Sequence, residues 1–537
     1  MHEPVPEAEA AAAAAAAPGY TPAGPDSVDS LFDHMSAAQR KRAHFFRQQV
    51  SFTDRLTTMA DSLRPVEKEQ RKAVLKQDLA ELPVAPFAYV PMCSSLDRFS
   101  YVLRALPNEC HAFTTKARVP ALMLFEVEEH PRSADVRGFL ELELAEYSDA
   151  DLAFAQAELP DKDASAAKRS TEGGDAEADP DLSKAAAATV NGAGLAGGSR
   201  FSSAIALASA QGQSTSSGAP ASSSSSGAQI VSQSQTIPEL YQTKLARLRL
   251  ESPFQQACPA WSVRGLIAKS NDDVRQEVFV MQLIEYYQRL FREAGLPLWL
   301  HTYTILSTSK STGLIQLIPD AYSIDSIKKR ADFPGSLRAY YEQLYGAPEK
   351  DGTEPANLSA ALSAFVESMA SYSIVCYLLQ IKDRHNGNIM IDTAGHIVHI
   401  DFGFVFGLAP GKAFSMELRV PWKLNKEMVA VMGGLQSKHY TRYVELCVKA
   451  LACARQPAAA DGAAALMEIL THKSNFPAFR YNPSAIADFR QRLLPRVSAD
   501  KKGELEKAVR GLLDQSYNNA GSDLYDSFQK ATNGIAP

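Results

Sequence analysis

The pattern of apolar and polar positions is sharpest around residues 389–400. Two apolar runs, 389–392 and 397–400, flank a polar turn that contains a glycine. Short apolar runs on either side of such a turn predict a tight β-hairpin. Antiparallel pairing would place the residues just outside the two arms, Asn388 and Asp401, at the same open end, about 5 Å apart.

Upstream of this hairpin, strand and helix patterns alternate. The sequence predicts a helix over 239–249, an alternating strand over 261–269, a helix over 271–294 and strands over 300–308 and 313–318. Asn271 is predicted to cap the third of these elements, with acidic residues in its first turn. The apolar stripe of that helix predicts its buried side, and it consists of Val280, Leu283, Ile284, Tyr287 and Phe291.

From residue 323 onward the pattern is mainly helical. Phe365, Met369, Tyr372 and Cys376 recur at helical spacing, which predicts a core helix leading up to the hairpin. Further helices are predicted over 430–537. The last stretch, around Tyr525 and Phe528, is amphipathic, so it is expected either to touch a membrane or to cap the fold.

The N-terminal half has a different composition. Residues 1–28 are rich in Ala, Pro and Gly, and 156–236 are rich in Ser, Ala and Gly, so both are predicted to be disordered. Residues 29–82 have helical spacing, and 83–155 contain strand-like runs such as 121–127. We therefore expect accessory helices over 29–82, and the first part of a β-rich lobe over 83–155 that is interrupted by the insertion.

Composition narrows the function classes. The 537 residues carry a net charge of −6, which argues against a nucleic-acid binder. The apolar runs, such as 374–381, fall short of the ~20 residues that cross a bilayer, and the alanine-rich start lacks the character of a signal peptide. Six cysteines without metal-ligand spacing indicate reduced thiols in the cytosol: Cys93, Cys110, Cys258, Cys376, Cys447 and Cys453.

The chemistry centres on the hairpin. Asp383 precedes Asn388 by five residues, and Asp401 opens an Asp-Phe-Gly triplet. Protein kinases use this spacing in H-R-D-x-x-x-x-N followed by D-F-G, although here Arg384 and His385 follow the aspartate. Amide and carboxylate oxygens are the ligands that Mg²⁺ prefers, so Asn388 and Asp401 are predicted to hold Mg²⁺, or Mn²⁺ in its place, beside ATP.

A second pair of charged residues fits the same chemistry. Glu277 lies on the apolar side of the predicted helix 271–294, where a carboxylate needs a charged partner. Lys269, at the end of the preceding strand, is the nearest candidate. Kinases position the ATP phosphates with such a strand lysine held by a helix acid; an ordinary structural ion pair is the alternative.

The loop D-R-H-x-x-N resembles the corresponding loop of the phosphatidylinositol 3/4-kinase superfamily. Gly387 and Glu277 resemble the residues found at these positions in its 4-kinases, and the chain is most similar to the type III beta group. Residues 376–382, 524–529 and 533–535 also carry the likeness, which covers 237–537 with weaker similarity at about 80–150. The resemblance implies an α+β, bilobal kinase-like fold. We expect a small β-rich N-lobe that resumes at 237–320 and a larger helical C-lobe at 321–537.

The resemblance implies further site residues. Ser252 lies where a short phosphate-covering loop is expected, and the junction after residue 318 resembles the adenine-binding hinge, with Ile318 and Ala321 as candidates. Lys412, Arg419 and Lys423 follow Phe402 in the predicted activation loop and are candidates for the lipid headgroup. So few cations favour unphosphorylated phosphatidylinositol over a headgroup that already carries phosphates.

The expected activity is transfer of the γ-phosphate of ATP to the 4-hydroxyl of phosphatidylinositol in membranes. Asp383 or His385 is expected to take the hydroxyl proton, and Arg384 to hold the loop. The resemblance also implies Rab-type small GTPases and Golgi adaptor proteins as partners, at Golgi, trans-Golgi or endosomal membranes. Three alternatives stay open at this stage: a phosphatidylinositol 3-kinase, a superfamily Ser/Thr protein kinase, and a non-catalytic membrane scaffold.

Overall fold

The computed structural model describes residues 35–84, 88–90, 92, 100–113, 119–129, 239–411, 417, 419–497, 503–517 and 519–537. Internal contacts divide the chain into two compact units: Met1–Ser51 with Asp135–Gly173, and Phe52–Ala134 with Gly174–Pro537. In the first unit the described part is residues 35–51, mainly the first half of helix α3 (Ala37–Ser62). The fold described below is that of the second unit. The predicted tail 1–28 and insertion 156–236 lie outside the described residues, and the domain boundaries stay predictions.

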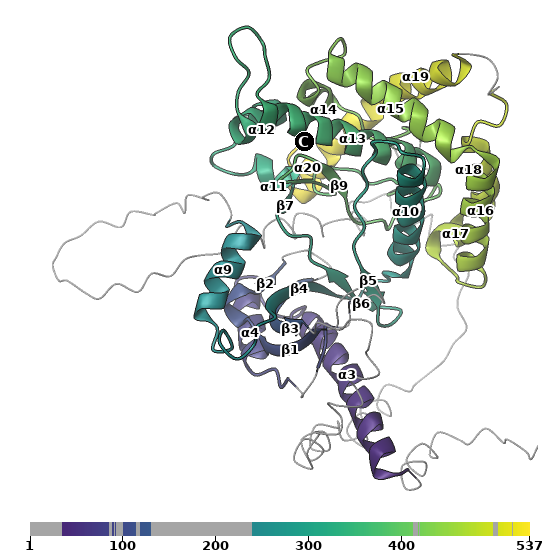
Figure 1. Ribbon diagram of the computed structural model, residues 1–537. Coiled ribbons are helices and arrows are strands. Elements are labelled where there is room, and N and C mark those ends of the chain that lie inside the picture. Colours follow the sequence, from purple (N-terminus) through teal and green to yellow (C-terminus); the bar gives the residue numbers. More distant parts are fainter. Residues whose placement is uncertain are drawn as a thin grey trace, which may run out of the picture. The chain divides into compact units, whose positions relative to one another are not determined.

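The first part of this unit is a six-stranded antiparallel sheet (Figure 1). The strand order is β1-β3-β4-β6-β5, with β2 paired to β3. The bounds are β1 Ser100–Ala105, β2 His111–Ala112, β3 Ala121–Glu129, β4 Trp261–Ser270, β5 Ile305–Ser307 and β6 Thr312–Gln316. Ala121 pairs with Ala268 and Glu128 with Trp261, so the strands before and after the long insertion are neighbours in one sheet.

Alternation along the strands gives the sheet two different faces. One face carries Leu266 and Phe125, which pack in a cluster with Leu56 of α3 and with α4 (Arg71–Ala80). The other face carries Ile267, which packs in the main core with residues of α9 (Tyr241–Glu251) and α10 (Arg275–Glu293). Lys269 is two residues from Ile267 and therefore faces the same side as α10.

The second part is a three-stranded sheet, β7 (Ala321–Ser323), β8 (Ile389–Asp392) and β9 (Ile397–His399), set among helices (Figure 1). The β8–β9 pair confirms the predicted hairpin. The helices are α11 Ile324–Lys328, α12 Leu337–Tyr345, α13 Ala356–Leu379, α14 Lys426–Val431, α15 Lys438–Ala454, α16 Pro457–Thr471, α17 Pro477–Tyr481, α18 Ala485–Arg492, α19 Glu504–Ser516 and α20 Ala520–Asn533.

The chain passes from one sheet to the other through residues 317–320, between β6 and β7. A β-rich first part and a helical second part joined by a short connection are the predicted α+β, bilobal organisation, which the structure confirms. The strands predicted over 300–308 and 313–318 form as β5 and β6, and both are shorter than predicted.

The start of α10 differs from the prediction. Asn271 has a left-handed backbone (φ 55°) and precedes the helix, whose N-cap residue is Val274. Asp273 organises this entry, because its Oδ1 accepts hydrogen bonds from the backbone N and the Nε of Arg275. The polar residues 271–273 therefore form a turn before the helix instead of its first turn.

Helix α13 corrects the expectation that apolar stretches fall short of a membrane span. Its 24 residues, with a mean hydropathy of 1.4 over the most apolar window, are long and apolar enough to cross a bilayer. However, 83% of that window is buried inside the fold, as in the core helix of a soluble protein. Phe365, Met369, Tyr372 and Cys376 all lie in its buried part, so the predicted core helix is confirmed.

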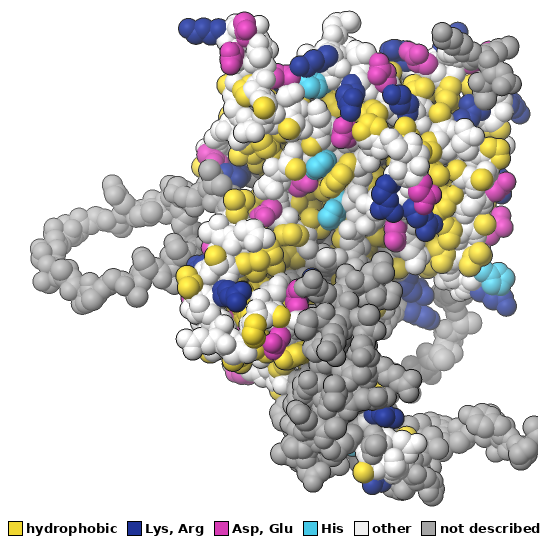
Figure 2. All heavy atoms as spheres, viewed as in Figure 1, with side chains coloured by type: hydrophobic (Ala, Val, Ile, Leu, Met, Phe, Trp, Pro, Cys, Tyr) yellow, Lys and Arg dark blue, Asp and Glu magenta, His cyan; other side chains and the backbone are white. Residues whose placement is uncertain are grey.

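The described surface and thiols agree with the composition. Cys110, Cys258, Cys376, Cys447 and Cys453 are free thiols. On the face shown in Figure 2, Lys and Arg side chains lie interspersed with Asp and Glu.

Candidate active site

The hairpin brings the two predicted metal ligands to one end. Ile389 pairs with His399, and one step further the N–H of Ile400 donates to the carbonyl of Asn388 at 3.2 Å. Asn388 therefore lies across from Ile400, within one residue of Asp401. At the far end Gly395 closes the turn with φ 94°, where a Cβ would meet the carbonyl oxygen of Ala361 at 2.8 Å, so only glycine fits.

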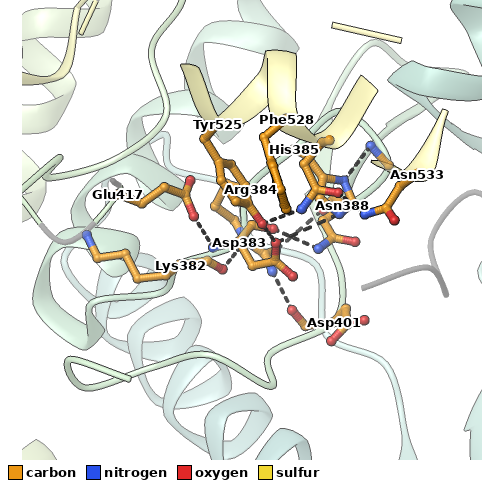
Figure 3. Close-up of polar contacts among 12 residues, drawn as sticks. Lys382, Asp383, Arg384, His385, Asn388, Asp401, Glu417, Tyr525, Phe528 and Asn533 are labelled. Carbon is orange, nitrogen blue, oxygen red and sulfur yellow. Dashed lines mark hydrogen bonds and ion pairs between the residues drawn. The ribbon is translucent and has the colours of Figure 1, made fainter. Parts of the chain in front are cut away.

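Arg384 holds the loop between α13 and the hairpin. Its guanidinium donates to the carbonyls of Lys382 at 2.9 Å and Ile400 at 2.7 Å, and also to the carbonyl of Asp401 (Figure 3). The side chain is buried and lies 5.6 Å from the ring centre of Phe402. Three carbonyls on both sides of the hairpin mouth are thus bound to one cation, which agrees with the loop-holding role expected for Arg384.

Asn388 and Asp401 offer hard oxygen ligands. The amide Nδ2 of Asn388 donates to the carbonyl of Asp383 at 2.7 Å, so the amide oxygen is the atom this side chain can give to a cation. Asp401 is partly exposed and has a left-handed backbone (φ 61°). Among the described residues no group of three or more His, Cys, Asp or Glu side chains could hold a metal. Two oxygen ligands fit Mg²⁺, which protein kinases and polymerases bind with one or two side chains and the substrate phosphates.

Asp383 is buried and bound on several sides. Its backbone is left-handed (φ 64°), and its N–H donates to Oε2 of Glu417 at 2.8 Å. Its Oδ1 accepts a hydrogen bond from the hydroxyl of Tyr525 in α20. Figure 3 shows Glu417 and Tyr525 reaching Asp383 from the activation segment and from the C-terminal helix.

His385 has a defined hydrogen-bonding state. Its Nδ1 accepts the N–H of Gly387 at 3.0 Å, so the proton of the neutral ring is on Nε2. Nε2 lies 3.9 Å from Oδ1 of Asp383. In this arrangement a neutral ring carries its N–H on the side of Asp383, and the choice of Asp383 or His385 as the base stays a prediction.

Lys269 and Glu277 form the predicted pair. The Nζ of Lys269 lies 2.8 Å from Oε1 of Glu277 and 3.2 Å from Oδ2 of Asp272, and all three side chains are buried. Burial lowers the pKa of Lys269, but the carboxylates of Glu277, Asp272 and Asp401 outweigh that effect. The lysine pKa therefore lies above its ordinary value, and the side chain is a fixed cation on the sheet face that carries α10.

Helix α10 is also attached to the Asp-Phe-Gly triplet. Nε2 of Gln276 donates to the carbonyl of Gly403 at 2.8 Å, and its Oε1 accepts the N–H of Ala478 at 3.0 Å. Gln276 precedes Glu277, so the helix acid and the triplet are held in one framework. The sequence analysis did not identify this residue.

The predicted hinge residues lie at the connection between the sheets. Ile318 is buried in the main core, and Ala321 pairs with Asp392 at the start of β7. A pocket beside this connection is lined by their neighbours Leu317, Pro319, Asp320 and Tyr322, together with Leu122 and Leu124 of β3. The adenine contacts predicted for Ile318 and Ala321 stay a prediction, with these neighbours as additional candidates.

The position of Ser252 does not agree with its predicted role. Its hydroxyl donates to Oε2 of Glu126, and Glu126 pairs with Val263. Val263 is six residues from Lys269 along β4, or about 20 Å at strand spacing. The serine therefore lies toward the opposite end of the strand from Lys269, and its role over the ATP phosphates stays a prediction that this position does not favour.

A better placed segment is the connection between β2 and β3. The N–H of Phe113 donates to the carbonyl of Pro120 at 2.9 Å, and the next residue, Ala121, pairs with Ala268 beside Lys269. This connection therefore begins and ends near the lysine. Residues 114–118 lie outside the described residues, and their Thr, Lys and Arg side chains were not considered as candidates above.

The three predicted headgroup cations have different positions. Lys412 lies outside the described residues. Arg419 is exposed. Lys423 is buried, and its ammonium group is paired with the carboxylate of Asp526 in α20. The structure therefore gives Lys423 a structural role in place of the predicted headgroup contact.

Asp272, Gln276, Glu417 and Tyr525 complete the site but were not predicted as site residues. Asp272 had been assigned to a helix start, and Tyr525 to an amphipathic end. One feature of the sequence could have drawn attention to Glu417, because it is a lone acidic residue among the cations of the predicted activation loop. Asp272 and Gln276 belong to the run 272–277 that resembles the start of a helix in the superfamily, whereas only the tertiary structure brings Glu417 and Tyr525 to Asp383.

The fold places a buried lysine with its helix acid on one sheet, and an aspartate loop and an Asp-Phe-Gly hairpin on the other. Kinases use this division of labour to hold ATP, so the fold and site define a kinase-like domain. Residues 264–463 match the family model described as "Phosphatidylinositol 3- and 4-kinase". Over this part the chain therefore resembles the phosphatidylinositol 3- and 4-kinases, in agreement with the loop motif.

Curated relatives match over about 300 residues of the chain. The chain is 39% identical over 302 residues to "Phosphatidylinositol 4-kinase" of Dictyostelium discoideum, which covers 56% of this chain and 24% of the relative. It is 40% identical over 301 residues to "Phosphatidylinositol 4-kinase beta 2" of Arabidopsis thaliana (55% and 26%). It is 36% identical over 299 residues to "Phosphatidylinositol 4-kinase beta" of Sorex araneus (56% and 35%). The matched regions thus span only about a quarter to a third of the length of these relatives.

Proposed function

We propose that this chain is an ATP-dependent 1-phosphatidylinositol 4-kinase, which forms phosphatidylinositol 4-phosphate at a cytosolic membrane surface. The observation that carries the proposal is the grouping of Lys269, Asp383, Asn388 and Asp401 within the region that matches the phosphatidylinositol 3- and 4-kinase family model. The names of the relatives support the 4-position, because each of the three described above is called a phosphatidylinositol 4-kinase.

In the proposed mechanism Lys269 offsets charge on the ATP phosphates, and Glu277 and Asp272 keep it oriented. Asp383 takes the proton of the inositol hydroxyl as the hydroxyl oxygen attacks the γ-phosphorus and the bond to ADP breaks. His385 lies beside Asp383, with its Nε2 3.9 Å from Oδ1, too far for a direct hydrogen bond, and its Nδ1 accepts the N–H of Gly387. Phosphoryl transfer has a loose transition state, so positioning and charge stabilisation contribute most of the rate.

Asn388 and Asp401 are the residues that would hold Mg²⁺, with Mn²⁺ as an alternative. When bound, the ion neutralises charge on the phosphate oxygens. The donor set supports this assignment, because residues with an amide oxygen and a carboxylate both lie at the open end of the hairpin.

Unphosphorylated phosphatidylinositol is the proposed lipid. Of the predicted headgroup cations, Arg419 is exposed, whereas Lys423 is paired with Asp526. An inositol already carrying phosphates would favour several converging cations. From the resemblance to type III beta 4-kinases alone, we propose that the chain acts at Golgi, trans-Golgi or endosomal membranes. On the same basis we propose Rab-type GTPases and Golgi adaptor proteins as its partners.

The test uses the full chain with Mg-ATP and liposomes that contain each inositol lipid in turn. We expect phosphorylation of phosphatidylinositol, with the new phosphate at the 4-position of the recovered lipid. Asp383→Asn should lower kcat by at least about 10²-fold, whereas His385→Gln should keep a measurable rate. A larger loss in His385→Gln than in Asp383→Asn would assign the base to the histidine.

Other outcomes would replace the proposal. Phosphate at the 3-position would indicate a phosphatidylinositol 3-kinase. Transfer to serine in a protein substrate without lipid phosphorylation would indicate a protein kinase. Tight liposome binding with no transfer to any lipid or protein would favour a membrane scaffold.

A further inference from the structure

The segment that follows the Asp-Phe-Gly triplet, from Phe404 to Lys423, is called the activation segment here, and the loop 382–388 before the hairpin is called the catalytic loop. The activation segment binds the catalytic loop at two adjacent residues. The N–H of Lys382 donates to the carbonyl of Phe404 at 2.8 Å, and its ammonium group donates to the carbonyl of Val420 at 2.5 Å. The N–H of Asp383 donates to Oε2 of Glu417 at 2.8 Å. Contacts from the beginning and the end of the segment thus meet where the proton acceptor is held.

The contact from Glu417 differs from the other two, because a side-chain carboxylate accepts the backbone N–H. Glu417 is 6% exposed, and Asp383 has a left-handed backbone, which is uncommon outside glycine. Surrounding contacts have to maintain such a conformation. The bond from Glu417 is applied directly to the strained residue, so it fixes the direction in which the Asp383 side chain leaves the backbone.

The charges around Glu417 show that an ionised carboxylate is destabilised at this position. Lys382 and Asp383 face it from the catalytic loop, Lys423 from the end of the activation segment and Tyr525 from α20. Burial raises the pKa of Glu417 to about 7, and the negative charge of Asp383 adds to the effect. A neutral acceptor would bind the same N–H without placing a second carboxylate beside the first. The costly choice favours a role in the reaction over a role in folding.

We propose that Glu417 is a positioning residue for phosphoryl transfer, which holds Asp383 in its reactive orientation through the bond to its N–H. This inference rests on the proposed function, in which Asp383 takes the hydroxyl proton.

The test compares Glu417→Ala and Glu417→Gln in the full chain, with Mg-ATP and phosphatidylinositol liposomes. Glu417→Ala should lower kcat by about 10²-fold, the loss expected for a displaced catalytic group, with little change in the KM for ATP. Glu417→Gln keeps an acceptor oxygen and should recover most of that loss. Glu427→Ala is the matched control, because Glu427 accepts the N–H of Leu337 and pairs with Lys328 outside the catalytic loop.

Two further readouts separate positioning from folding. If Glu417 acts through Asp383, then Asp383→Asn with Glu417→Ala should be no slower than Asp383→Asn alone. The ratio of the Glu417→Gln rate to the unmodified rate should rise as the pH falls from 8 to 6. Over this range the glutamate of the unmodified protein becomes protonated, whereas the glutamine of the variant does not change. Additive losses or a constant ratio would overturn the inference. An inactive unmodified chain would overturn the proposed function and this inference with it, whereas an active chain that tolerates Glu417→Ala would overturn the inference alone.

Discussion

The ammonium group of Lys269 lies 2.8 Å from Oε1 of Glu277, and both side chains are almost completely buried. The two residues come from β4 and α10, so this ion pair fixes the helix to the sheet as well as orienting the lysine. A charge left without its partner in such surroundings is more costly than the intact pair is stabilising.

Glu277→Ala should therefore lower both stability and ATP binding. We expect a loss of about 3 kcal/mol in the free energy of unfolding, near the lower end for a broken buried pair because Asp272 still faces Lys269. The KM for ATP should rise. Urea denaturation and steady-state kinetics measure the two effects, with the exposed Glu285→Ala on the same helix as the control.

The double variant Lys269→Ala with Glu277→Ala tests the physical reason. Removing both charges leaves neither member of the pair without its partner, although Asp272 also loses its contact with Lys269, so stability should recover only in part while activity stays lost. A double variant less stable than Glu277→Ala would show that packing, and not the unpaired charge, explains the first result.

Local patterns were enough to predict this pair and the hairpin. Period-two alternation defined β4, the apolar stripe of α10 placed Glu277 inside, and two apolar runs around Gly395 fixed the register that brings Asn388 near Asp401. In each instance the residues that meet lie close together in the sequence, so element type and spacing determine the contact.

Prediction was weakest for contacts between distant segments. Ser252 was assigned by its order in the sequence, yet its bond to Glu126, 126 residues away, places it toward the end of β4 opposite Lys269. Lys423 was counted as a solvent-exposed cation, but Asp526, 103 residues further on, binds it in the interior. Burial of this kind depends on how α20 docks, which no local periodicity encodes.

Asp401→Asn should abolish transfer while the protein stays folded. Asparagine tolerates the left-handed backbone of residue 401 (φ 61°) and keeps similar volume, so little stability should be lost. It removes the negative charge that binds the cation, and kcat should fall by at least about 10²-fold with a higher Mg²⁺ requirement. Rates at several Mg²⁺ concentrations and thermal unfolding test both parts, with Asp461→Asn as a control. Retained activity would overturn the metal assignment.

Arg419 and Lys423 should behave differently although both follow the Asp-Phe-Gly triplet. Arg419→Ala should raise the KM for phosphatidylinositol without changing stability, because the side chain is exposed. Lys423→Ala leaves Asp526 buried and unpaired, so the free energy of unfolding should fall by about 3 kcal/mol. Liposome titrations and urea denaturation distinguish these effects. A stable Lys423→Ala protein with a raised lipid KM would restore the original headgroup assignment.

Glu417→Gln should make the protein more stable at pH 8 while making it slower. In the folded protein the pKa of Glu417 is about 7, compared with an ordinary value of 4.5. A carboxyl group whose pKa is raised by folding binds its proton more tightly in the folded state. Its contribution therefore favours folding below pH 4.5 and is lost as the pH rises past 7. At pH 8 the ionised side chain costs about 3 kcal/mol by this linkage, which a glutamine avoids.

The gain in stability from Glu417→Gln should shrink as the pH falls from 7 and disappear below about pH 4.5, where the glutamic acid is protonated in the folded and the unfolded protein alike. Urea denaturation of both proteins between pH 5 and 8 measures this trend. A variant that is less stable at pH 8 would mean that Lys382 and Lys423 stabilise the carboxylate more than burial destabilises it. A variant that is more stable and also slower would show that the carboxylate beside Asp383 is kept for catalysis at the expense of the fold.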